Sequence, residues 1–213
     1  MTVKFFKFIT ASSIVLLLII IIYSLKWKMV IDTPVLFYHA FLYDAFNLVP
    51  YRDFFCLAMP GNIATYYFFA QIGGYSDLSI RIYDCIILLL ILFFIYKTML
   101  FFSREAAIIS VIFFGYMFIV FGPYYTLQPD FICILPISII LYLVKTYDKT
   151  NYIKTFVFLI GFLFSVVFLN KPQQAFGLAP VLFFLIFFQK TSHKFFKLTT
   201  IIKTILSAGF GFL

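Results

Sequence analysis

Charged side chains stand at the ends of several long apolar segments of this chain. Asp32 follows the first such segment, Asp130 precedes a later one, and Lys171 lies between two more. A carboxylate in such a place can act as a general base, and a lysine can neutralise the negative charge of a phosphate group. These residue types therefore suit a transfer reaction in which a base activates an acceptor and a cation stabilises a departing phosphate.

Motifs for several other chemistries are absent from the sequence. It contains no Gly-x-x-x-x-Gly-Lys phosphate loop, no His-Glu-x-x-His metal motif and no nucleophile elbow around a serine. Cys56, Cys85 and Cys133 are scattered without a Cys-x-x-Cys pair, so they indicate neither a disulfide framework nor a metal site. We interpret them as small, buried apolar residues.

The composition is that of an integral membrane protein. Hydrophobic residues make up 64% of the 213 residues and charged residues only 11%, against about 25% charged residues in a soluble domain. A helix satisfies its own backbone hydrogen bonds in lipid, and the alternating polarity of a membrane barrel is missing. We therefore predict an all-α fold, a polytopic bundle of about six or seven transmembrane helices.

Apolar segments of the length needed to cross a bilayer can be located directly. No cleavage pattern follows the first of them, so we expect it to stay as an uncleaved span. The last begins near residue 200 and continues to Leu213, so we expect residues 1–213 to form a single transmembrane domain, the N-terminal part of a longer protein. The complete segments are residues 8–25, 82–101, 106–122, 131–145, 153–169 and 175–189.

Residues 57–75 are apolar but contain several residues that interrupt a span, including Pro60, Gly61 and Asn62. If this stretch does not cross and the N-terminus is inside, most of the 16 basic residues fall on the inner side, as the positive-inside rule requires. If it crosses, most of them fall outside. We therefore predict that residues 57–75 lie along the outer surface as an amphipathic or re-entrant helix.

With this topology, residues 26–81 form one long outer loop that carries membrane-surface helices. The shorter loops around Asp130 and Lys171 face the same side, so most of the unusual polar groups gather on one surface. The basic residues occur in short clusters between apolar segments, which is typical of membrane topology and excludes a nucleic-acid partner. We expect a multi-pass protein of the bacterial cytoplasmic (inner) membrane, with the membrane of the endoplasmic reticulum as the alternative.

The stretch from Asp32 to Asp84 carries a recognisable order of motifs. Asp32-Thr33-Pro34 predicts the start of a short helix that bears Tyr38-His39, with Asp32 or Thr33 as its cap. Two further motifs and an arginine follow. They are Pro50-Tyr51-Arg52-Asp53-Phe54, Pro60-Gly61 and Arg81.

This order resembles the first outer loop of the GT-C glycosyltransferases, which use polyprenyl-phosphate sugars. It is similar to the protein-mannosyltransferase-like and aminoarabinose-transferase-like members. Gln128-Pro129-Asp130 resembles the second outer loop of this superfamily, and Asn170-Lys171-Pro172 resembles a later one. There are two departures: Asn47 stands where a glycine is expected, and Thr33 stands where a second acid often follows the first. Asn47 is a mild departure because asparagine also tolerates a left-handed backbone.

The resemblance implies an inverting transfer of a sugar from a polyprenyl-phosphate carrier to a lipid, glycan or protein acceptor. It implies Asp32 as the base, Asp130 as an assisting residue of the pocket, and Lys171 at the phosphate. Further candidates for binding the substrate or its phosphate are Arg52, Asp53, Arg81 and Tyr38. The resemblance requires no cofactor, although some related enzymes use a divalent metal ion, and no metal ligand can be named from this sequence.

Each candidate also has a structural interpretation. Asp32 could only cap a helix, Asp130 could only complement a helix dipole, and Lys171 could be a lysine that reaches from a span end to water. Arg52 and Asp53 could form a local ion pair. Arg81 and Asp84 have the i, i+3 spacing of a helical pair, which favours packing.

Two other functions remain open from the sequence alone. A transporter or flippase would place ionisable groups inside its spans and show internal repeats, and neither is visible here. A catalytically inactive fragment that keeps the scaffold is the other alternative.

Overall fold

The computed structural model describes residues 2–30, 32–124, 127–146 and 153–188. It divides the chain into two compact units, residues 1–132 and residues 133–213, which are described separately. Helices form almost all of the regular structure in the described part, which confirms the all-α prediction. They are α1 Thr2–Ser24, α2 Asp32–Phe46, α3 Pro60–Gly73, α4 Asp77–Met99, α5 Arg104–Phe121, the 3-10 turn η1 Gly122–Tyr124, α6 Pro129–Thr146, α7 Ile153–Asn170 and α8 Pro172–Phe188.

Each of the six complete apolar segments coincides with a helix. Three helical stretches are long and apolar enough to cross a membrane: Asp77–Met99, Arg104–Tyr124 and Pro129–Thr146. Phe8–Ser24 and Thr155–Asn170 are apolar helices of somewhat shorter length. The expected seventh segment, near residue 200, lies outside the described residues.

Helices α2 and α3 are too short to cross a bilayer. The 14 residues of α3 extend over about 21 Å at 1.5 Å per residue, against a hydrocarbon core of about 30 Å. Pro60 begins α3 at a position where its missing N–H costs nothing, and Gly74 ends it with φ of 75°. The length of α3 therefore supports the prediction that residues 57–75 do not cross.

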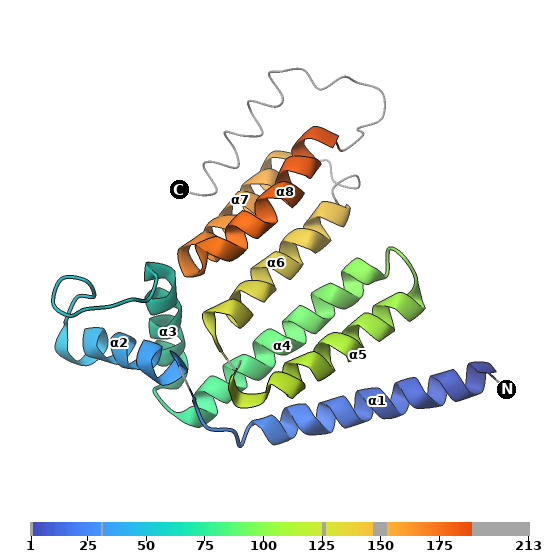
Figure 1. Cartoon of the computed structure of the whole chain (residues 1–213), viewed down its shortest axis with the longest axis horizontal. Coiled ribbons are helices and arrows are strands. Elements are labelled where there is room, and N and C mark those ends of the chain that lie inside the picture. Colours follow the sequence, from blue (N-terminus) through green and yellow to red (C-terminus); the bar gives the residue numbers. More distant parts are fainter. Residues whose placement is uncertain (1, 31, 125–126, 147–152, 189–213) are drawn as a thin grey trace. The chain divides into compact units, whose positions relative to one another are not determined.

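In the first unit, α4 and α5 form an antiparallel hairpin and α1 lies beside α5 (Figure 1). Leu17 of α1 packs directly on Gly115 of α5, where an added Cβ would stand 2.6 Å from the Leu17 Cδ2 atom. Helices α2 and α3 contact each other and lie at the end of the unit where α1 ends and α4 begins. The turn between α4 and α5 is at the opposite end.

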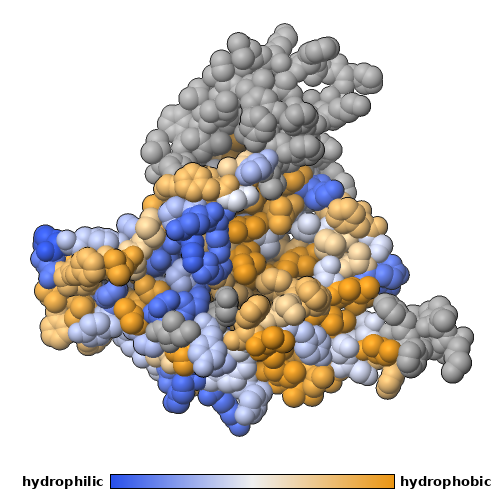
Figure 2. Space-filling view, in the orientation of Figure 1, coloured by the Kyte–Doolittle hydropathy of each residue, from blue (hydrophilic) through white to orange (hydrophobic). Residues whose placement is uncertain are grey.

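Contacts between α2 and α3 are partly aromatic and partly polar. The Phe37 and Tyr66 rings meet edge to face with centroids 5.0 Å apart. The Asp44 carboxylate accepts hydrogen bonds from Gln71 Nε2 at 2.8 Å and from the Tyr75 hydroxyl at 3.3 Å. In Figure 2, hydrophilic residues gather over the end that holds α2 and α3, and hydrophobic residues cover much of the α4–α5 face.

The described part of the second unit is built on the α7–α8 hairpin, with α6 packed against it. One core cluster joins Ile140 of α6, Phe156 and Ile160 of α7, and Leu178 of α8. Pro172 begins α8 directly after Lys171, because proline is favoured at the first position of a helix. Lys171 thus stands in a tight turn at the positive end of α8.

Candidate active site

A cavity of about 340 Å³ lies in the first unit beside the first turns of α2 and α3. Its polar lining comes from Asp32 and His39 of α2 and from Asn62 of α3. Its other lining residues are apolar: Val35, Leu36, Leu57, Ala58 and Pro129. The volume is within the usual range for sites that bind small molecules.

Helix α2 places Asp32, Leu36 and His39 on one face because residues four and then three positions apart share a face of a helix. Asp32 is in the first turn of α2 and is exposed. Its carboxylate has no hydrogen bond or ion pair with any residue that the structure describes. It can therefore accept a proton or a hydrogen bond from a ligand in the cavity.

His39 contributes an imidazole ring to the same cavity. Its Nδ1 atom lies 3.3 Å from the Cys56 Sγ atom, in a contact where either atom could be the donor. Partial burial lowers the pKa of His39, which favours the neutral ring at physiological pH. The ring is half-buried, so it can contact a ligand while Cys56 holds its orientation.

Asn62 is the residue of this cavity that the sequence pattern did not single out. Its side chain is buried, with 5% of the residue exposed, and its Oδ1 atom has no hydrogen-bond partner within the described residues. A buried amide oxygen without a partner costs about 1–3 kcal/mol. The only signal in the sequence is a polar residue at the start of an otherwise apolar helix, next to Pro60-Gly61.

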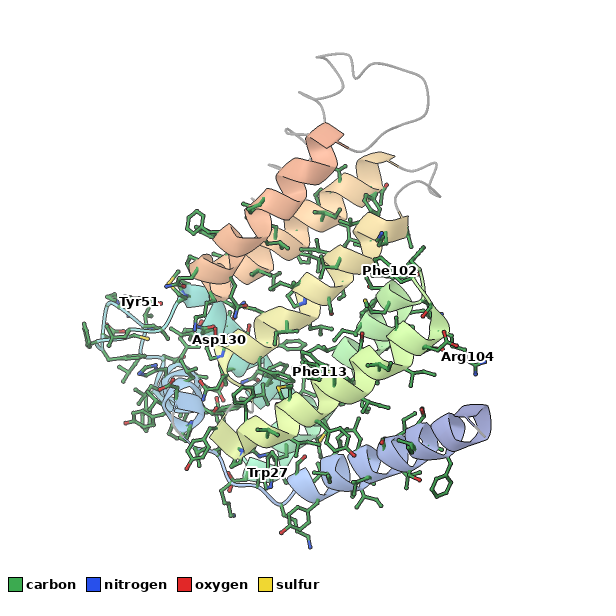
Figure 3. All side chains as sticks on the ribbon, turned by 45° about the vertical axis from the view of Figure 1, so that its right-hand side comes forward. Trp27, Tyr51, Phe102, Arg104, Phe113 and Asp130 are labelled. Carbon is green, nitrogen blue, oxygen red and sulfur yellow. The ribbon has the colours of Figure 1, made fainter. Side chains whose placement is uncertain are left out.

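Asp130 is half-buried at the start of α6, at the end of the first unit where α2 and α3 lie (Figure 3). Its neighbour Pro129 lines the cavity with Asp32. Gln128 Nε2 donates a hydrogen bond to the Thr33 hydroxyl at 3.3 Å, which joins the start of α2 to the segment before α6. The structure thus brings the Asp32 and Asp130 segments to one place.

Arg81 and Asp84 form a buried pair on α4, and this pair binds the backbone before α2 and the backbone before α6. Arg81 donates a hydrogen bond through Nε to the Trp27 carbonyl at 3.0 Å and another through Nη2 to the Lys28 carbonyl. Asp84 accepts one from the Leu127 amide at 2.9 Å. The Arg81 Nη1 and Asp84 Oδ2 atoms are 3.9 Å apart, and both side chains are almost fully buried. Figure 3 shows Trp27 beside the first turns of α4.

Leu127 belongs to the segment that leads into α6, and its contacts hold that segment in place. It has φ of 49°, which is unusual for a leucine, and it is completely buried. Its amide bonds Asp84, and its carbonyl accepts a hydrogen bond from the Tyr66 hydroxyl of α3. We call this set, Arg81, Asp84, Tyr66 and the backbone that they bind, the α4 clasp. It positions the segments that lead into α2 and α6 and does not itself line the cavity.

Arg52 and Asp53 bind each other in the loop between α2 and α3. Two parallel hydrogen bonds join them, at 2.8 Å from Nε and 2.7 Å from Nη2. The second carboxylate oxygen also accepts from the Val49 amide at 2.7 Å. This geometry supports the local ion pair, and neither residue lines the cavity. Asn47 has φ of 53° at the start of the loop, so it adopts the left-handed backbone that a glycine would.

The remaining two candidates lie elsewhere. Tyr38 is on α2 but is exposed and does not line the cavity. Lys171 belongs to the second unit, where it is half-buried and its amide donates to the Val167 carbonyl at 2.7 Å.

The residues of the cavity do not form a metal site. No three His, Cys, Asp or Glu side chains in the described ranges come close enough to hold an ion together. The described residues therefore offer no ligand set for the metal ion that some related enzymes use.

Asp53 provides a test of the loop geometry. The hydrogen bonds from Arg52 and then from Val49 lower the pKa of Asp53 to about 2. A depressed pKa means that these bonds are complete above the ordinary carboxyl range and are lost as the pH falls through about 2. We expect Asp53→Ala to speed amide hydrogen exchange at Val49 at neutral pH, because alanine leaves the Val49 amide without its acceptor. Exchange at Val49 equal to that of the unmodified chain would contradict the assigned bond.

A comparison with protein families decides the identity. A family model described as dolichyl-phosphate-mannose-protein mannosyltransferase matches residues 60–210. The chain belongs to this family. It is therefore an integral membrane protein of a GT-C glycosyltransferase family, as the order of motifs indicated. No curated protein and no solved structure matches the chain.

Membership in the mannosyltransferase family implies a lipid-linked sugar donor. The match begins at Pro60, the first residue of α3, and includes Asn62, Asp130, Lys171 and the three side chains of the α4 clasp. Asp32 and α2 precede the matched residues. Their assignment rests on the cavity and on the order of motifs in the first loop.

Proposed function

We propose that this chain transfers a sugar from a polyprenyl-phosphate carrier to a lipid, glycan or protein acceptor at the outer face of the membrane. The observation that carries the proposal is the cavity beside α2 and α3. There an exposed carboxylate with no hydrogen-bond or ion-pair partner among the described residues faces a space of small-molecule size, in a chain of the mannosyltransferase family.

In the proposed reaction, Asp32 takes the proton of an acceptor hydroxyl or amine. The acceptor atom attacks the anomeric carbon of the sugar from the face opposite the phosphate. The bond between that carbon and the phosphate oxygen breaks, and polyprenyl phosphate leaves with the electron pair. One bond forms as one breaks, so the anomeric configuration is inverted. Asp130, which follows the lining residue Pro129, is the proposed assisting carboxylate.

Lys171 is the proposed partner of the phosphate. It immediately precedes α8, so its ammonium group and the N-terminal end of that helix both favour a negative charge. Arg52 is already paired with Asp53, and Arg81 donates to the Trp27 and Lys28 carbonyls. We assign both arginines to loop and clasp geometry, and Lys171 to the phosphate from its place directly before α8. Tyr38 remains a candidate for contact with the lipid-linked substrate at the surface.

The outer location is a separate part of the proposal. It places the N-terminus and the α4–α5 turn inside, with α2 and α3 on the periplasmic side of a bacterial cytoplasmic membrane or in the lumen of the endoplasmic reticulum. Ala64→Cys, on the exposed side of α3, should react with an impermeant maleimide in intact cells, and Phe102→Cys should not. Both variants are made with the native cysteines replaced by alanine. If only Phe102→Cys is labelled, the orientation is the reverse of the proposed one.

The reaction itself is tested with a panel of labelled polyprenyl-phosphate sugars, mannose included. Membranes that contain the chain are expected to release polyprenyl phosphate from at least one of them, faster than membranes without it. If membranes with and without the chain release polyprenyl phosphate equally from every sugar of the panel, the proposed transfer is contradicted.

A further inference from the structure

Asn62 occupies a place in the cavity that packing alone does not explain. It is on the first turn of α3 and, at 5% exposure, is more than nine-tenths buried. Its side-chain carboxamide makes no hydrogen bond with any residue that the structure describes. Nearby, the buried amide of Gln128 does have a partner, the Thr33 hydroxyl. Buried polar groups are normally paired, so the exception at Asn62 needs an explanation.

The surroundings of Asn62 suggest what its partner is. Asp32 and His39 line the same cavity, and the rest of its wall is apolar. A carboxylate accepts hydrogen bonds, and a carboxamide can either accept or donate, because its oxygen and nitrogen exchange places by a simple rotation of the side chain. A ligand with several hydroxyl groups on a compact ring can form hydrogen bonds with these polar side chains. An apolar ligand would leave the three polar groups unpaired.

We propose that Asn62 binds a hydroxyl group of a sugar ring held in the cavity beside Asp32. This inference rests on the proposed function and adds to it the residue that recognises the sugar. In this inference Asn62 is a binding residue, and Asp32 remains the base. The sugar belongs either to the donor or to a glycan acceptor, since both present the same chemistry.

The test uses Asn62→Leu, which keeps the branched shape of the side chain, and Asn62→Ala, which adds no volume. Binding to the purified chain is measured with polyprenyl-phosphate mannose, with polyprenyl phosphate, and with methyl mannoside as a free sugar. If Asn62 holds the donor sugar, both variants bind polyprenyl-phosphate mannose about tenfold more weakly, the usual effect of one hydrogen bond, and polyprenyl phosphate unchanged. If it holds an acceptor sugar, only methyl mannoside binding weakens.

Thermal unfolding separates binding from a structural role. Because the Asn62 oxygen has no hydrogen-bond partner in the described part of the chain, Asn62→Leu is expected to keep or raise the unfolding temperature. The matched control is Gln128→Leu, which removes a paired buried amide and is expected to lower it. A lower unfolding temperature in both Asn62 variants, or unchanged affinity for all the sugars that the unmodified chain binds, would overturn the inference. If the unmodified chain binds no polyprenyl-phosphate sugar at all, the proposed function and this inference both fail.

Discussion

Asp32→Asn is expected to lower the rate of sugar transfer by about 10²–10⁴-fold, the contribution that a positioned general base makes. Asparagine keeps the size of the side chain and loses the basic oxygen. The Asp32 carboxylate makes no contact that stabilises the described part of the chain, so insertion and unfolding temperature should not change. The measurement is donor turnover at saturating donor, normalised to inserted protein.

The control for Asp32 is Asp44→Asn on the same helix. Asp44 is exposed and bonds Gln71 and Tyr75, away from the residues that line the cavity. The asparagine oxygen can still accept the bond from Gln71, and its NH2 group can donate to the Tyr75 hydroxyl oxygen, so turnover should stay near that of the unmodified chain. An equal loss of turnover in both variants would mean that α2 has been disturbed and that Asp32 has no special role.

Arg81→Met is expected to destabilise the chain by about 3–5 kcal/mol, the cost of removing one partner of a buried ion pair. The variant leaves the Asp84 carboxylate buried without its cation and removes the donors that hold the Trp27 and Lys28 carbonyls. The segment before Asp32 then loses its anchor, so transfer should fall as well. Thermal unfolding in detergent measures the first effect.

The comparison for Arg81 is Lys28→Met, which removes the Lys28–Asp77 pair. Lys28 is 81% exposed, and such surface pairs contribute only about 0–1 kcal/mol. The double variant Arg81→Met/Asp84→Leu should be less destabilised than the sum of its parts, because neighbouring partners are coupled. An unfolding temperature of Arg81→Met that equals that of Lys28→Met would contradict the α4 clasp.

The helices could be predicted from the sequence because a long apolar segment has few other stable states in lipid. Their first residues were less certain. Helix α4 begins at Asp77 and not at residue 82, since Ser76 caps it by accepting a hydrogen bond from the Ser79 amide at 3.2 Å. Helix α8 begins at Pro172 and not at residue 175. Both starts carry signals, a serine cap and an N-terminal proline, that hydrophobicity alone overlooks.

The site was only partly predictable. Asp32 and Asp130 stand out in the sequence because a charge at the end of an apolar segment is unusual. Arg81 and Asp84 stand out because of their i, i+3 spacing. The roles of Asn62 and His39, and the carbonyl partners of Arg81, depend on how α2 packs on α3 and on the loops. The Thr33–Gln128 and Asp84–Leu127 bonds join residues that are 95 and 43 positions apart, and no local pattern reports such contacts.

The most direct test of the account is a structure of the chain with a non-transferable phosphonate analogue of its polyprenyl-phosphate sugar. The account predicts the sugar ring in the cavity between α2 and α3, with the Asp32 carboxylate facing the side of the anomeric carbon opposite the phosphonate. A bound analogue whose sugar lies outside this cavity, with Asp32 remote from the anomeric carbon, would contradict it.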